Sequence, residues 1–261
     1  PTGFNRATQA MRQAGASLKP LVYAMAFAQT DEDGMPRWKS SDTVSNYRRT
    51  FEGTDGWRPR NVGGYSETAS LAYSLTMSQN IATATLLEEL GGPRALVEFA
   101  EQLGFDSHEW REEMGLALGQ AEVTPLDMSR FVSTILRGGQ LATGSPLITA
   151  RDIRGRVHFE ESEEPPFVLS PEAAVLTRDM MRLVVDSGTA GAVRGAAGRL
   201  GYYGQAIGKT GTTDSEKDLW LVGGTSHYSA GLWLGYDQPS RIGGSSSDLA
   251  APLWGWWARA V

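Results

Sequence analysis

The chain has 261 residues, of which 41% are hydrophobic and 21% are charged. This composition excludes a disordered, collagen-like or fibrous chain. The formal net charge of −6 leaves no basic surface for a nucleic-acid backbone, and the absence of cysteine excludes thiol catalysis, disulfide bonds and cysteine-ligated zinc. No apolar run approaches the roughly 18 residues of a membrane-spanning helix, and no signal peptide opens the chain. We therefore expect either a cytosolic protein or an excised part of an exported one.

The N-terminal third predicts helices on both sides of a long loop. Residues 16–29 are densely apolar with a proline in the first turn, which indicates a buried helix. Residues 30–66 are rich in Gly, Pro, Ser and Asp and predict a structured loop. A helical pattern then covers residues 67–77, breaks at residues 78–80 and resumes over residues 81–90.

The middle of the chain predicts three further helices, over residues 93–103, 124–137 and 170–186. Thr124 and Ser170 are each followed by a proline. A capping side chain before a first-turn proline is typical of a helix N-terminus.

Beyond residue 200 the sequence predicts strands over residues 205–212, 218–225 and 230–236. The second and third are apolar at both alternating positions, so we expect a sheet that is covered on both faces. Residues 248–261 predict a helix that supplies one cover. Helices followed by an antiparallel sheet and a last helix indicate the α+β class.

Three short motifs carry the chemical signal. They are Gly15-Ala16-Ser17-Leu18-Lys19-Pro20 at a helix start, Ser78-Gln79-Asn80 at the break between two helices, and Lys209-Thr210-Gly211-Thr212-Thr213 on a strand. Each alone is weak, because Ser and Asn also suit helix caps and turns and a lysine suits a solvated strand position. Their order and their flanking residues make the set specific.

In that order the motifs resemble the S-x-x-K, S-x-N and K-T-G signature of penicillin-binding proteins and serine β-lactamases. The resemblance is closest to the transpeptidase domain of the bifunctional, class A penicillin-binding proteins. It also rests on flanking residues 4–8, 12–13, 116–119, 122–126 and 218–220.

The resemblance implies one penicillin-binding transpeptidase domain over residues 1–261. Its fold is an α+β fold in which an antiparallel sheet is covered by helices and lies beside an all-helical lobe. The helical lobe is expected roughly over residues 30–200, and the sheet with the last helix roughly over residues 201–261.

The activity that the resemblance implies is D,D-transpeptidation, the cross-linking of peptidoglycan stem peptides by acyl transfer from D-Ala-D-Ala. No cofactor or metal is expected. In this scheme Lys19 is the base for the nucleophile, Ser78 relays a proton to the leaving amine, and Lys209 keeps that relay poised. Asn80 positions Lys19 and the substrate amide.

The third motif is expected to bind the substrate. The resemblance assigns the terminal carboxylate to Thr210 and Thr212, with Gly211 and Thr213 completing the segment. A glycine there lets a ligand backbone approach closely. The backbone N–H groups of residues 16 and 212 are expected to form an oxyanion hole.

The sequence departs from the family pattern at the nucleophile, because Ala16 stands where the family has serine, three residues before Lys19. Three residues advance about 300° on a helix, so positions 16 and 19 share a face, whereas Ser17 faces away. Alanine has no hydroxyl to activate. We expect no acyl-enzyme from this chain.

Ala16 is either an engineered change or a natural one, and the sequence leaves both open. Ala14, where relatives commonly carry proline, favours natural divergence. A natural alanine makes the chain a noncatalytic peptidoglycan-binding scaffold or sensor. A third reading is a β-lactamase-like hydrolase, but the E-x-x-x-N loop signature of one β-lactamase class is not recognisable.

Only 15 residues precede Ala16, so the strands that begin the family's sheet are expected to be missing and the chain to be a fragment. The class A resemblance implies an upstream glycosyltransferase domain and membrane anchor, and an extracytoplasmic location. Expected partners are stem peptides ending in D-Ala-D-Ala and β-lactams, with no nucleic acid.

Other features carry little chemical signal. The three histidines, at positions 108, 158 and 227, show no metal-ligand spacing. The acidic run over residues 160–164 predicts a solvated loop. We expect the tryptophans at positions 254, 256 and 257 to pack on the sheet. Trp57 and Tyr65 either line a substrate groove or hold the long loop in place.

Overall fold

The structure is a computed structural model that describes residues 3–144, 147–160, 164–196 and 199–261. Its helices are α1 (Arg6–Gln9), α2 (Lys19–Ala28), α3 (Leu71–Thr76), α4 (Asn80–Glu89), α5 (Gly92–Gln102), α6 (Pro125–Leu136), α7 (Pro171–Ser187) and α8 (Ala250–Ala260). Short 3-10 turns are η1 (Gly15–Leu18), η2 (Met114–Leu118), η3 (Gly191–Arg194) and η4 (Asp214–Glu216). The predicted helices therefore all form, and residues 16–29 divide into η1 and α2.

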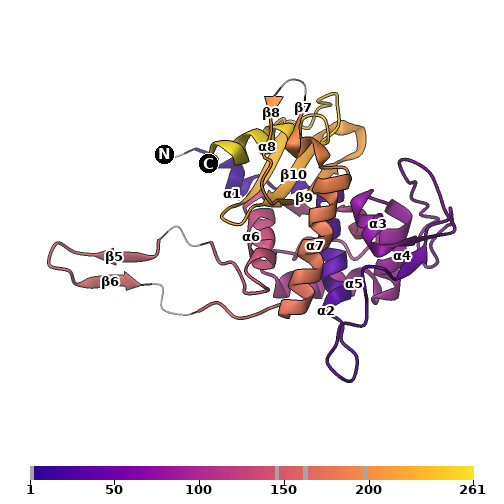
Figure 1. The fold of residues 1–261 in the computed structure, drawn as a ribbon, viewed down its shortest axis with the longest axis horizontal. Coiled ribbons are helices and arrows are strands. Elements are labelled where there is room, and N and C mark those ends of the chain that lie inside the picture. The colour runs from indigo at the N-terminus through magenta and orange to yellow at the C-terminus, as the bar shows by residue number, and fades with distance from the viewer. Residues whose placement is uncertain (1–2, 145–146, 161–163, 197–198) are drawn as a thin grey trace.

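The main sheet is antiparallel, with the strand order β11-β10-β9. Its strands are β9 (Ile207–Thr212), β10 (Asp218–Gly224) and β11 (Ser229–Gly235). Every residue of β10 is buried. Trp220 donates from its indole to the Gln13 carbonyl on one face, whereas Gly223 on the other face lies against Trp254 of α8. Gly224, on the face opposite Gly223, lies against Leu136 and Val132 of α6, so the sheet is covered on both faces as predicted; Figure 1 shows α8 and α6 at opposite sides of the sheet.

The centre of the helical part is α2, which packs against α7, α4 and α5. Every residue from Lys19 to Phe27 is buried. The helical pattern predicted from residue 67 is wrong in its first turn, because β3 (Thr68–Ser70) pairs with β2 (Thr43–Ser45). Ser70 accepts a hydrogen bond from the Tyr73 backbone N–H and so caps α3, which starts the helix at Leu71.

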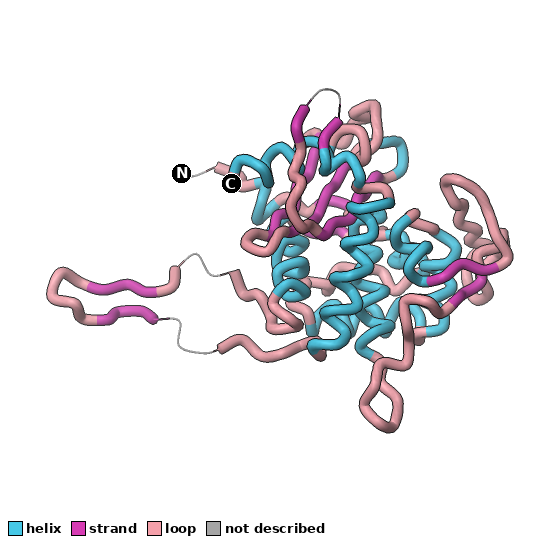
Figure 2. The backbone as a smooth tube through the Cα atoms, in the orientation of Figure 1, coloured by secondary structure: helices cyan, strands magenta, loops and turns pink. Residues whose placement is uncertain are grey.

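Three small pairings complete the structure. They are β1 (Arg12–Gln13) with β4 (Glu122–Val123), β5 (Thr149–Arg151) with β6 (Val157–Glu160), and β7 (Gly195–Ala196) with β8 (Arg199–Leu200). The β5–β6 hairpin projects from the body of the molecule, and the sequence reading did not predict it (Figure 2). Of the predicted acidic loop, residues 161–163 lie outside the described residues, and Glu160 ends β6.

The tryptophan predictions hold only in part. Trp254 is 1% exposed and donates to the Ala230 carbonyl of β11, while its ring meets that of Trp257 edge-on at 5.6 Å. Trp256 is 55% exposed and does not pack on the sheet. Among the described helices, none has both the length and the apolar character needed to cross a membrane.

The helices of residues 30–200 lie directly on the sheet, since α6 contacts β10 and β11 and α7 contacts β9. The turn η1, from the N-terminal segment, also contacts β9 and β10. The boundaries expected for a helical lobe and a sheet lobe stay a prediction.

Candidate active site

Lys19 is the first residue of α2 and is completely buried. Its ammonium nitrogen donates to the Ser78 carbonyl at 2.8 Å and to Asn80 Oδ1 at 2.7 Å, and lies 3.3 Å from Ser78 Oγ. The side chain therefore reaches from the first motif into the second.

The second motif lies in the turn between α3 and α4. Ser78 has a left-handed backbone with φ 55°, a conformation that is costly for a residue with a side chain. The turn returns the chain sharply, so that Asn80 begins α4 while the Ser78 carbonyl and hydroxyl both face Lys19. The side-chain nitrogen of Asn80 also has a partner in the protein: Nδ2 donates to the Arg60 carbonyl at 2.5 Å.

Lys209 reaches the same place from β9. Its ammonium nitrogen donates to Ser78 Oγ at 3.0 Å and to the Thr210 carbonyl at 2.9 Å, and its side chain is fully buried. The structure thus brings Lys19, Ser78, Asn80 and Lys209 into one hydrogen-bonded cluster.

Burial controls the charge of this cluster. Desolvation, followed by repulsion from Lys209, holds the pKa of Lys19 well below its usual range. Desolvation alone lowers the pKa of Lys209 to about 7. No carboxylate is among the hydrogen-bond partners described for either ammonium. Burial therefore favours the uncharged form of Lys19, an amine that has a lone pair and can accept a proton.

Ala16 lies one 3-10 turn before Lys19 and is half-buried. In a 3-10 turn residues i and i+3 lie on the same side, so positions 16 and 19 keep the shared face that the sequence predicted. Ser17 is fully buried, and its hydroxyl donates to the Ala14 carbonyl at 2.7 Å. The Ser17 hydroxyl is therefore held by its own turn and does not replace the missing nucleophile.

Gly211 and Gly119 let this turn lie against its neighbours. A Cβ on Gly211 would lie 2.6 Å from the Ala14 carbonyl oxygen and 2.7 Å from the Ser17 nitrogen. Gly119 is equally tight, because a Cβ there would lie 1.8 Å from the carbonyl oxygen of Gly15. Gly211 is therefore needed for close approach of the protein's own backbone, and its expected role toward a ligand stays a prediction.

The threonines of the third motif occupy different surroundings. Thr210 is 4% exposed and its hydroxyl pairs with that of Thr189 at 2.7 Å. Thr212 is half-buried, and its hydroxyl lies 2.8 Å from that of Ser246. Thr213 turns away to Asp218, donating to its carboxylate at 3.1 Å and accepting from its backbone N–H at 3.0 Å. Thr213 thus closes the β9–β10 turn.

The long loop supplies a polar network that the sequence reading missed. Asn61 Oδ1 accepts hydrogen bonds from the backbone N–H groups of Asn80 and Ile81, at 2.8 and 3.0 Å. It thereby caps α4, whose own N-cap residue, Gln79, makes no capping bond. Asn61 in turn donates to Asn46, and Asn46 donates to Gln79. Nothing in the local pattern separates these asparagines from the ordinary turn residues around them.

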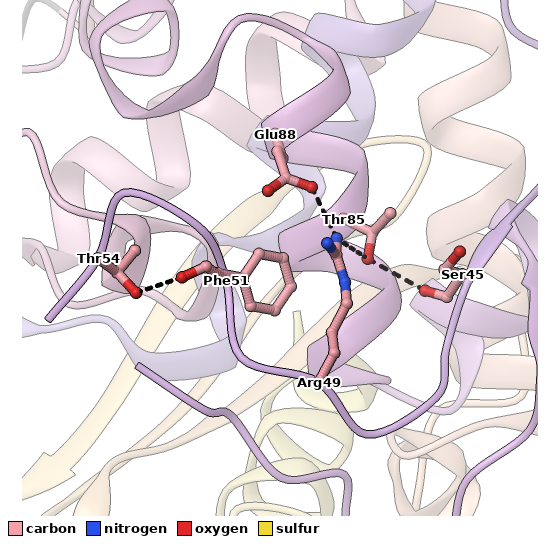
Figure 3. A network of polar contacts seen from close by, with 6 residues as sticks. All are labelled: Ser45, Arg49, Phe51, Thr54, Thr85 and Glu88. Atoms are coloured by element: carbon pink, nitrogen blue, oxygen red, sulfur yellow. Dashed lines mark hydrogen bonds and ion pairs between the residues drawn. The ribbon is translucent and has the colours of Figure 1, made fainter. Parts of the chain in front are cut away.

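A second set of contacts fastens this loop to α4 (Figure 3). Arg49 donates to Glu88 at 2.7 Å and to Thr85 at 3.0 Å, and its guanidinium carbon lies 4.1 Å from the centre of the Phe51 ring. Thr85 donates to the Ser45 carbonyl. Trp57 packs on Phe51 at 5.3 Å, which favours the reading that it holds the loop in place. Tyr65 is 46% exposed, with the Arg48 guanidinium over its ring at 5.3 Å.

The cluster is suited to proton transfer between hydroxyl and amine groups. It holds two amines and one hydroxyl within hydrogen-bonding distance, in a place where burial favours the uncharged amines. Among the described residues, no group of three or more histidine or acidic side chains is arranged to hold a metal ion.

Comparison with known proteins gives a consistent result. The family "Penicillin binding protein transpeptidase domain" matches residues 2–238. Penicillin-binding protein 1A of Neisseria flavescens is 33% identical over 264 residues, and that of Clostridium botulinum is 31% identical over 261 residues. These alignments cover 96% and 97% of this chain but 31% of each relative, so the chain spans about a third of their length.

Solved structures share the fold. Penicillin-binding protein 1A from Haemophilus influenzae superposes with a TM-score of 0.82 at 23% identity, over 99% of this chain and 43% of that one. PonA1 from Mycobacterium tuberculosis, in complex with penicillin V, superposes with a TM-score of 0.79 at 26% identity, over 98% of this chain and 70% of that one.

Proposed function

The chain belongs to the penicillin-binding protein transpeptidase domain family, and on that premise we propose that it recognises D-Ala-D-Ala stem peptides and β-lactams without being acylated by them. The proposal rests on one observation. Lys19, Ser78 and Lys209 form a hydrogen-bonded relay, and one 3-10 turn before Lys19 the nucleophile position is Ala16.

The relay supports a definite sequence of proton transfers for a serine at position 16. Neutral Lys19 would use its two N–H groups for the Ser78 carbonyl and Asn80, which leaves its lone pair for the serine proton. The serine oxygen would then attack the carbonyl between the two D-alanines. The C–N bond would break as Ser78 passes a proton to the leaving amine, and Lys209 would return a proton to Ser78.

The amine of a second stem peptide would then attack the acyl-enzyme and take over the acyl group, which forms the cross-link and frees the serine. With alanine at position 16 no oxygen is present to attack, so the acyl-enzyme cannot form there. The backbone N–H groups of Ala16 and Thr212 do not depend on the missing hydroxyl. We therefore expect the chain to bind these ligands noncovalently even though it cannot be acylated by them.

Ala16 also supports a second candidate function, that of a noncatalytic scaffold or sensor that binds peptidoglycan. The first candidate is a D,D-transpeptidase domain in which alanine replaces a natural serine, whereas the scaffold or sensor carries a natural alanine at position 16, so the genomic codon separates them. An extracytoplasmic site of action, a membrane anchor and a glycosyltransferase domain in the parent protein remain parts of this proposal.

Intact-mass spectrometry after incubation with benzylpenicillin tests the proposal. The chain should gain no penicillin mass, and Ala16→Ser should gain one equivalent. The double variant Ala16→Ser with Lys19→Met should again gain none, because the base is gone. An adduct on the unchanged chain, for example at Ser17, would contradict the assignment of position 16, and an unreactive but folded Ala16→Ser variant would contradict the proposed relay.

A further inference from the structure

The loop before α8 makes a side-chain contact with the third motif. Ser246 lies in this loop and is 3% exposed. Its backbone N–H donates to Thr212 Oγ1 at 3.1 Å, and its hydroxyl oxygen lies 2.8 Å from the same Thr212 oxygen. One buried serine thus makes two hydrogen bonds to one threonine hydroxyl.

Burial decides which hydroxyl donates in this pair. A hydroxyl has one proton and can accept two hydrogen bonds. Within the described part of the chain, Thr212 is the only partner of the Ser246 hydroxyl. If Thr212 gave its proton to Ser246, the Ser246 proton would be buried without an acceptor, which is unfavourable. The stable arrangement therefore has Ser246 donating to Thr212.

This direction has a consequence for Thr212. Its oxygen then accepts from both the N–H and the O–H of Ser246, so its acceptor capacity is filled and its own proton must point elsewhere. Thr212 is half-buried, so this proton can reach a ligand. Its backbone oxygen would lie 3.1 Å from a Cβ on Gly15, the neighbour of Ala16, so Thr212 adjoins the nucleophile position.

We propose that Ser246 is a positioning residue that fixes the Thr212 hydroxyl as a hydrogen-bond donor to a ligand carboxylate. The inference rests on the proposed function, in which the third motif binds the terminal carboxylate of the acyl donor. Thr210 is the weaker donor in this site, because it is 4% exposed and its hydroxyl is paired with Thr189. The carboxylate specificity of the third motif is thus set from outside the motif.

The test compares the affinities of the unreactive chain for benzylpenicillin and for its methyl ester, which lacks the carboxylate charge. Each ligand is titrated into the chain, and binding is monitored by NMR. The starting chain should bind the carboxylate form better than the ester. Ser246→Ala should reduce this carboxylate-to-ester preference by about three- to tenfold, with ester affinity unchanged. The matched control is Ser245→Ala in the same loop. The Ser245 hydroxyl donates to Asp248, and its removal should leave the carboxylate-to-ester preference unchanged.

A double-mutant cycle separates positioning from general loop damage. If Ser246 acts through Thr212, then Ser246→Ala should have no further effect in a Thr212→Val background. An unchanged preference in Ser246→Ala, or an equal loss in the Thr212→Val background, would overturn the inference while the proposed function stands. A starting chain that binds neither ligand would overturn both, and retained ester binding in each variant shows that the site is still folded.

Discussion

Lys19 and Lys209 both direct their ammonium nitrogens at the hydroxyl of Ser78, at 3.3 and 3.0 Å. Both lysines are fully buried, and the described contacts of their nitrogens are with carbonyl, amide and hydroxyl oxygens. Two positive charges at such spacing in a dry site repel strongly. The fold therefore favours the loss of a proton from this pair, and burial lowers the pKa of both lysines.

The first prediction concerns stability and pH. The pKa of Lys209 is about 7 in the folded chain and about 10.4 in an unfolded one, so the unfolded chain binds more protons between these values. The free energy of unfolding should therefore rise as the pH increases from about 7 to about 10, by up to about 1.4 kcal/mol per pH unit for each such lysine. Lys19 contributes with the same sign, because burial lowers its pKa as well.

Urea unfolding at a series of pH values measures this rise. Lys209→Met should reduce the rise, because it removes the contribution of Lys209 and the part of the lowered Lys19 pKa that comes from repulsion by Lys209. The exposed Lys39, replaced by methionine, is the control and should leave the slope as it was. Equal slopes for Lys209→Met and the starting chain would show that Lys209 stays charged when folded.

The second prediction concerns Gly211. A Cβ at this position would lie 2.6 to 2.8 Å from atoms of Ala14 and Ser17, two of which are backbone atoms that cannot turn away. Gly211→Ala should destabilise the fold by about 2 kcal/mol or more, because β9 must move off η1. Gly191→Ala is the control, since the nearest atom to its Cβ would be 3.9 Å away, and it should cost less than about 0.5 kcal/mol in urea unfolding.

The third prediction concerns the cap supplied from the long loop. Asn61→Ala should cost about 1 to 2 kcal/mol, because two backbone N–H groups at the start of α4 lose their acceptor. In the Ala16→Ser background it should also slow acylation, since Asn80 then holds Lys19 less firmly. The same replacement at Asn5, which caps the exposed α1, should leave acylation unchanged. Equal acylation rates for the two variants would refute the link from Asn61 to the site.

The fourth prediction concerns the contact between Arg49 and Glu88 in Figure 3. Their side chains are 21% and 37% exposed, so the pair is less screened by solvent than an open surface pair. A double-mutant cycle with Arg49→Met and Glu88→Gln should give a coupling free energy of about 1 kcal/mol. The exposed pair of Arg94 and Glu98, on one helix, is more fully screened by solvent, should give a smaller coupling free energy and serves as the reference. A smaller value for the Arg49 pair would contradict its role in holding the loop.

Local patterns were sufficient for most helix positions and for the three strands of the main sheet. The cap and proline at Thr124 and at Ser170 predicted the starts of α6 and α7, because a helix N-terminus depends on its own first turn. Apolar residues at both alternating positions of β10 predicted a sheet covered on both faces, because each face of a strand is set by its own residues. The pairing of β2 with β3 escaped prediction, since strand pairing depends on a partner that lies distant in sequence.

The motifs by themselves determined which residues would meet, and the absence of a hydroxyl at position 16 is a fact of the sequence. Only the tertiary structure decided how they meet. It buried Lys19 and Lys209 on one hydroxyl, used Gly211 for backbone packing, turned Thr213 to Asp218, and placed Asn61 and Ser246 beside the motifs. The reason is physical: desolvation, close approach and hydroxyl direction depend on neighbours brought together by folding, which local residue spacing does not specify.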